Sequence, residues 1–256
     1  MGSEFGYEYR YGFSMVDENQ INSKFKSKKP TEDGGRVFVF EIRTNFIAVL
    51  WTDYEEERVL IDSESFDTYL ENAPDDMFLR VNTCYRLKDY WMTLSEITNF
   101  TRSAFAFAER MAARPENASL SHIPVVVSFE VCTVQKEGEL HEAVMDRAIC
   151  NRRLVPLYLY PCQTITEMPK PMDVYVKQTL RRLPRTRVED TDQELASPMS
   201  ACHFCSKRPC AGAQITLLRC NHAFHSHCIV RWLEDNNLCP LCDYDVYFRF
   251  NNTPQP

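Results

Sequence analysis

The chain has 256 residues, of which 44% are hydrophobic, and a net charge of −7. That length suffices for one large or two small domains, and the acidic balance argues against a nucleic-acid-binding protein, which usually has a basic face. No apolar run approaches the ~18 residues of a membrane span, and the first residues show no signal peptide. We therefore expect a cytoplasmic or nuclear protein, or both, bound to neither membrane nor nucleic acid.

The composition of the N-terminal third of the chain changes from polar to apolar after about residue 35. Residues 1–34 are polar without a sustained period, so we expect them to be disordered. The stretches that follow are apolar and rich in β-branched residues, and they predict strands at 36–44, 45–53, 57–63 and 77–87.

A helix is expected to start near Thr93 or Ser95 and to stop before Pro115, because apolar residues recur along it at helical spacing. Beyond it, the sequence predicts a strand at 123–134, a helix at 138–152 and a strand at 154–160. Together these elements predict an α+β domain of mixed strands and helices over residues 35–162.

The α+β domain shows no pattern of a known catalytic site. His122 and His141 stand alone, and there is no glycine-rich phosphate loop, nucleophile elbow or paired-carboxylate signature. The apolar stripe of the long helix fits a core better than a ligand pocket.

Residues 163–200 contain several prolines and a polar run, which predict a linker. Within it, residues 173–183 can form a short helix able to dock on either neighbouring domain. Two basic clusters, at 24–29 and 181–187, are read as solvated linker rather than as a nuclear signal.

Cysteine and histidine concentrate at the C-terminal end. Seven of the eleven cysteines and four of the six histidines lie between residues 202 and 242. Without a secretion signal, such clustering indicates metal ligands in a reducing compartment rather than disulfides. Four closely spaced pairs supply eight ligands, enough for two closed tetrahedral zinc sites: Cys202, Cys205, Cys220, His222, His225, Cys228, Cys239 and Cys242.

Closed sites of this kind are structural. A zinc ion with four protein ligands has no open position at which to activate water or polarise a substrate. The two ions would replace the core that some forty residues cannot supply. Cys210, five residues after Cys205, is a spare thiol outside the pattern, and we expect it not to be a ligand.

The spacing resembles the RING finger of the two-histidine class, a zinc finger found in E3 ubiquitin ligases, including numerous plant RING ligases. PHD and LIM zinc folds fit less well. The resemblance covers about residues 202–242, roughly a sixth of the chain, and it implies a cross-brace. We expect the zinc-finger domain to span residues 201–247, followed by a short tail at 248–256. In that arrangement, one zinc is shared by the first and third pairs of ligands and the other by the second and fourth. Each site then has three thiolates and one imidazole, hence a net charge of −1.

Three further residues match the groove in which RING fingers of this family receive a ubiquitin-conjugating enzyme. Phe204 lies between the first two ligands, Trp232 follows Cys228 by four residues in a short helix, and Pro240 lies inside the last pair. The alternative is that all three only pack the small core, but Leu218, Phe224 and Ile229 are better suited to that role.

The resemblance implies a ligase that holds a ubiquitin-loaded conjugating enzyme beside a substrate lysine without forming a covalent intermediate, so no residue of this chain is assigned a catalytic role. The N-terminal domain would then recruit an unknown protein substrate or partner. One departure favours the alternative of a non-catalytic zinc scaffold. Active members often have Arg or Lys directly after the last ligand, where it bonds both the enzyme and ubiquitin, and here that residue is Asp243.

Overall fold

The computed structural model describes residues 6–16, 36–52, 55–71, 75–160, 172–188 and 199–247. The chain divides into two compact units, Met1–Asn151 with Tyr160–Met168, and Arg152–Leu159 with Pro169–Pro256. Among the described residues, no helix combines the length and the apolar character that crossing a membrane requires.

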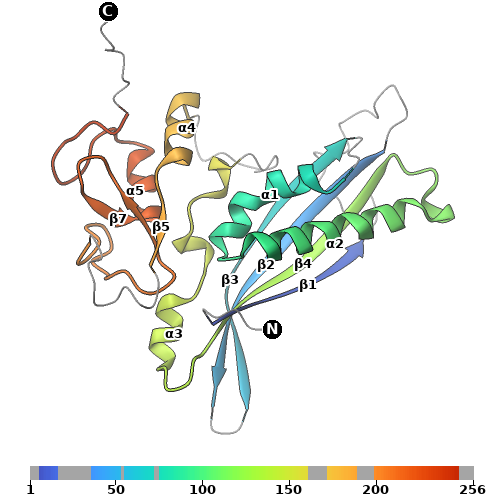
Figure 1. The fold of residues 1–256 in the computed structure, drawn as a ribbon, viewed down its shortest axis with the longest axis horizontal. Helices are drawn as coiled ribbons and strands as arrows, with labels where there is room; N and C mark the ends of the chain where they lie inside the picture. The colour runs from blue at the N-terminus through green and yellow to red at the C-terminus, as the bar shows by residue number, and fades with distance from the viewer. Residues whose placement is uncertain are drawn as a thin grey trace, which may run out of the picture. The chain divides into compact units, whose positions relative to one another are not determined.

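The first unit is a four-stranded sheet covered on one face by two helices (Figure 1). The strands are β1 (Tyr7–Met15), β2 (Val37–Trp51), β3 (Glu56–Glu71) and β4 (His122–Val134), in the spatial order β1-β4-β2-β3. β2 and β4 run parallel, whereas β1–β4 and β2–β3 are antiparallel. The mixed strand and helix character predicted from the sequence is confirmed.

The covering helices are α1 (Met77–Asp89) and α2 (Leu94–Ala112). α2 confirms the predicted helix and its start, since Thr93 forms a capping box with Glu96. Its buried face packs aromatic rings against the sheet, for example Phe100 against Phe129 at a centroid distance of 5.3 Å.

The expectation of disorder over residues 1–34 is wrong for residues 7–15, which form the edge strand β1. Tyr7, Tyr9, Tyr11, Phe13 and Met15 alternate along it with polar or small residues, the period of a strand. Tyr11 and Phe13 both contact Phe100 of α2. Residues 17–34 lie outside the described part of the chain.

The strand predicted at 77–87 is also wrong, because this segment is helix α1. Leu79, Thr83, Arg86 and Leu87 are buried, with the spacing of one helical face. The opposite face is apolar as well, since Phe78 and others remain exposed, and this second set of apolar residues hides the helical period.

Arg86 of α1 is fully buried and joins the helix to β3. Its guanidinium donates to the Glu64 carboxylate and, at 3.5 Å, to Asp89. The Tyr90 hydroxyl also donates to Glu64, and the Tyr160 hydroxyl donates to Asp89 at 2.6 Å. Burial acts to lower the pKa of Arg86, but the Glu64 carboxylate outweighs it and raises the pKa, so the side chain stays charged.

Other elements between residues 36 and 160 differ from the prediction in length or in type. The two strands expected at 36–44 and 45–53 are the single strand β2, and the helix expected at 138–152 is reduced to α3 (His141–Arg147). No strand forms at 154–160; instead, the 3₁₀ helices η3 (Asn151–Arg153) and η4 (Leu157–Leu159) flank Pro156, which cannot donate to a strand ladder. A third 3₁₀ helix, η2 (Pro115–Asn117), follows α2.

The second unit contains α4 (Val174–Arg182), β5 (Thr186–Arg187), β6 (Gln214–Leu217), β7 (Ala223–His225) and α5 (Ser226–Leu233). The strands form a sheet in the order β5-β6-β7. α4 confirms the short helix predicted at 173–183, and it belongs with this unit. The described part of the predicted linker is therefore structured, because β5 pairs with β6 and Val188 exchanges backbone hydrogen bonds with Gly212 and Ala213.

Candidate metal centres and the adjoining apolar groove

The eight predicted ligands form two separate groups. One contains Cys202, Cys205, His225 and Cys228, and the other contains Cys220, His222, Cys239 and Cys242. Within each group the ligand atoms all lie within 4.8 Å of one another. Each group takes one pair from the first half of the motif and one from the second, which is the cross-brace.

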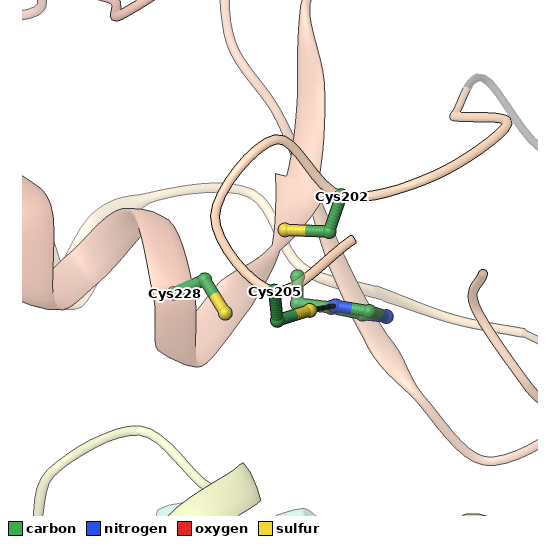
Figure 2. Close-up of side chains that lie close together, drawn as sticks. Cys202, Cys205 and Cys228 are labelled. Carbon is green, nitrogen blue, oxygen red and sulfur yellow. Dashed lines mark hydrogen bonds between the residues drawn. The ribbon is translucent and has the colours of Figure 1, made fainter. Parts of the chain in front are cut away.

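Local structure explains how the first group is assembled. Cys202 and Cys205 lie on a tight turn, in which the Ser206 N–H donates to the Cys202 carbonyl at 2.8 Å. His225 ends β7 and Cys228 lies in the first turn of α5. Figure 2 shows the three thiols gathered from the turn and the helix into one place.

The distances fit zinc. The Cys205 Sγ lies 3.2 Å from the His225 Nδ1, and the Cys239 Sγ lies 3.6 Å from the His222 Nδ1. In a tetrahedral site with Zn–S near 2.3 Å and Zn–N near 2.0 Å, the S···N edge is about 3.6 Å. The two clusters can thus bind two zinc ions, and with four protein ligands each they are structural rather than catalytic.

A hydrogen bond couples two of the cysteines of the first group. The pKa of Cys202 is lowered to about 2, first because the Cys228 thiol donates a hydrogen bond to its thiolate. The same contact raises the pKa of Cys228. Bound Zn²⁺ would keep both sulfurs as thiolates, because a coordinating thiol is deprotonated.

Cys210, His203 and His227 are not members of either ligand group. Cys210 is half-buried and belongs to neither, and His203 is exposed. His227 is half-buried and its ring is stacked on that of His225, with a centroid distance of 5.5 Å. Burial lowers the pKa of His227 to about 4.

The three residues expected to form a groove lie next to ligands of both metal groups: Phe204 and Trp232 near the first, and Pro240 between two ligands of the second. The rings of Phe204 and Trp232 are 5.7 Å apart, and both are partly exposed, as is Pro240. The Trp232 indole donates from Nε1 to the Leu238 carbonyl at 2.9 Å, which fixes the ring plane. By contrast, the residues expected to pack the core, Leu218, Phe224 and Ile229, are buried, at 3%, 0% and 0% exposure.

Two further exposed leucines near these residues were not predicted. Leu238, directly before the last cysteine pair, is 36% exposed, and Leu241, inside that pair, is 48% exposed. The signal was present in the sequence Leu-Cys-Pro-Leu-Cys, where one leucine precedes the last ligand pair and the other lies inside it. The groove surface is therefore defined as Phe204, Trp232, Leu238, Pro240 and Leu241.

Asp243 follows the last ligand with its side chain in solvent. Its backbone is left-handed, with φ of 57°, and its N–H donates to the Cys239 carbonyl at 2.9 Å. Aspartate tolerates this conformation better than most residues.

Comparison with known proteins agrees with the metal geometry. Residues 193–243 match the family model described as the RING-H2 zinc finger domain. The mouse E3 ubiquitin-protein ligase RNF126 is 36% identical over 74 residues, which cover 29% of this chain and 22% of the relative. The Arabidopsis thaliana RING-H2 finger protein ATL79 is 34% identical over 70 residues, covering 27% of this chain and 42% of that protein.

A solved structure, the RING-H2 domain of Arabidopsis RMR1, is 32% identical over 27% of this chain and 85% of that chain, with a TM-score of 0.24. The chain spans only about a fifth to two fifths of the lengths of the curated relatives named above. The similarity lies in the segment that carries the two Cys/His clusters. This chain therefore contains a RING-H2 zinc finger domain, the domain through which it is similar to these E3 ubiquitin ligases and RING-H2 finger proteins.

Proposed function

We propose that this chain is a RING-type E3 ubiquitin ligase that binds a ubiquitin-loaded conjugating enzyme and promotes ubiquitin transfer to a substrate lysine. The observation that carries the proposal is the groove surface, whose exposed apolar residues lie next to ligands of both metal groups. The backbone that carries the five residues of the groove surface would be held by the two zinc ions. These side chains would therefore lose little conformational entropy when a loop of the partner binds.

Transfer would need no nucleophile from this chain. The zinc sites have no open position, so the domain would act by holding the thioester of the conjugating enzyme near the acceptor and restricting it to a reactive conformer. The first unit, which has a core of its own, would recruit the protein substrate. The proposed setting is the cytoplasm, the nucleus or both.

The test of the groove is a binding titration with a panel of unloaded conjugating enzymes. Trp232→Ala removes the largest ring, and hot spots of this type contribute ~2 kcal/mol, so affinity should fall about thirtyfold. Trp51→Ala is the matched control, because Trp51 is an exposed tryptophan of the first unit, at 53% exposure. Equal affinities for Trp232→Ala and wild type would contradict the groove.

A second candidate function is a zinc scaffold that does not stimulate transfer. Asp243 favours it, because a carboxylate cannot donate a hydrogen bond to the carbonyls that the usual Arg or Lys contacts. Autoubiquitination with purified chain, activating enzyme, ubiquitin and the same panel separates the two. Binding of a conjugating enzyme without any transfer would support the scaffold.

A further inference from the structure

Helix α5, which carries Trp232, is held by residues outside the segment that matches the RING-H2 family model. Arg231 of α5 donates from its guanidinium to the Arg152 carbonyl at 2.9 Å. Directly after α5, the Glu234 carboxylate accepts a hydrogen bond from the Tyr158 hydroxyl. Arg152 and Tyr158 both belong to the short segment Arg152–Leu159, which is part of the second unit.

A second set of contacts holds the end of α5. The Tyr247 hydroxyl donates to the Leu233 carbonyl, the last of the helix. The Tyr247 carbonyl in turn accepts from the Tyr175 hydroxyl of α4 at 3.0 Å. The C-terminal end of α5 is therefore fixed through two tyrosines that lie outside residues 193–243.

Glu234 is the charged group of this arrangement. Burial, followed by the hydrogen bond and the charge of Glu234, raises the pKa of Tyr158. Burial and the same carboxylate raise the pKa of Tyr247. Both hydroxyls stay protonated at neutral pH and remain hydrogen-bond donors.

The contacts to segment 152–159 and the groove lie on different sides of α5. Successive residues of a helix are rotated by about 100°, so positions 231 and 234 are about 60° apart, and Trp232 points about 130° away from their mean direction. A contact at Arg231 and Glu234 consequently fixes the rotation of α5 about its axis without occupying the groove.

We propose that Tyr158 and Glu234 are positioning residues for Trp232. The hydrogen bond between Tyr158 and Glu234 fixes α5, so that the Trp232 indole lies against Phe204 and donates to the Leu238 carbonyl. This inference rests on the proposed function for its consequence, the affinity for a conjugating enzyme. The functional RING module of this chain is then larger than its zinc-binding core and includes segment 152–159.

The first experiment reads the position of Trp232 without any partner. The full chain, labelled with ¹⁵N-tryptophan, gives indole N–H signals from its three tryptophans, and Trp232→Phe assigns one of them. Tyr158→Phe should shift the Trp232 signal, because the hydrogen bond to Leu238 changes, while the signals of Trp51 and Trp91 stay in place and two zinc ions remain bound.

The second experiment measures affinity for a conjugating enzyme. Tyr158→Phe and Glu234→Ala should each weaken binding about tenfold, the scale of one hydrogen bond to a charged group. Glu234→Gln should restore binding, because its amide oxygen still accepts from Tyr158. The double variant Tyr158→Phe with Glu234→Ala should bind no more weakly than either single variant, since both remove one shared contact.

The matched control is Tyr9→Phe, which removes a tyrosine hydroxyl that donates to the Tyr90 carbonyl at 2.7 Å in the first unit. It should change neither the Trp232 signal nor the affinity. An unmoved Trp232 signal in Tyr158→Phe would overturn the positioning role, and so would loss of zinc in that variant, which would show a role in folding. If wild type binds no conjugating enzyme, the proposed function fails, but the Trp232 signal still tests the positioning role.

Discussion

Asp243→Arg adds a long hydrogen-bond donor at the position where active members of the family often have one. The side chain at this position is exposed, so the substitution meets no packed neighbours. Its folding cost comes from the backbone, because φ of 57° is left-handed and a long side chain loses about 1 kcal/mol there relative to a helical conformation. Zinc binding, at roughly 10–16 kcal/mol per structural site, outweighs that cost, so both ions should stay bound.

The gain in transfer follows from the added donor. A hydrogen bond from a guanidinium is worth about 1.5–3 kcal/mol, and solvent exposure reduces it. We expect a rise of about tenfold in the rate at which a saturated ligase discharges ubiquitin from its conjugating enzyme to free lysine, corresponding to about 1.4 kcal/mol. The affinity for the unloaded enzyme should be unchanged, since the added contact includes ubiquitin.

Asp243→Asn is the matched control. Asparagine also accepts the left-handed backbone and removes the negative charge, but its amide is too short to replace an arginine. Its discharge rate should stay within about twofold of wild type. A rise as large as that of the arginine variant would show that charge removal is responsible, and no rise in either variant would refute the placement of residue 243 beside ubiquitin.

Three other expectations concern the metal centres and the two units. Metal analysis of the purified chain should find about two zinc ions, and Cys210→Ser should not change that number; one ion or none would contradict the ligand groups. A fragment of residues 150–250 should fold with zinc and unfold with a chelator, and it should be more stable to urea than 197–250, which lacks β5 and α4. Arg86→Met leaves two buried carboxylates without their cation and should lower the free energy of unfolding of the first unit by about 3–5 kcal/mol, whereas Arg102→Met on the exposed side of α2 should change it by under about 0.5 kcal/mol.

The metal ligands were predictable because short-range spacing determines them. Four closely spaced Cys/His pairs within about forty residues are typical of zinc ligands, so the eight ligands could be identified before any fold was known. The start of α2 near Thr93 was predictable for the same reason, because its capping box involves only Thr93 and Glu96. The division of the ligands between two ions was not, since His225 and Cys202 are brought together only by the folded domain, and that part came from the family resemblance.

The wrong predictions for α1 and β1 arose where local sequence does not determine the structure. α1 is apolar on its exposed face as well as its buried one, because Phe78 and Val81 remain in solvent, so its sequence lacks a clear helical period. The alternation of Tyr7 to Met15 was present in the sequence, but a strand at the edge of a sheet is stabilised by a partner, β4, more than one hundred residues later.

Long-range polar contacts were beyond prediction from one sequence. Arg86 and Glu64 are 22 residues apart, and Tyr158 and Glu234 are 76 apart, and no local pattern connects them. Such pairs form only when two elements distant in the sequence pack together, so they cannot be identified from neighbouring residues.

The most direct measurement is the rate at which the full wild-type chain discharges ubiquitin from a loaded conjugating enzyme to free lysine. With at least one enzyme of a broad panel, wild type and Trp51→Ala should accelerate discharge equally, whereas Trp232→Ala should fall to the rate without ligase while retaining both zinc ions. No acceleration by wild type with any enzyme, or full activity in Trp232→Ala, would contradict the assignment of this chain as a RING-type ligase that acts through its groove surface.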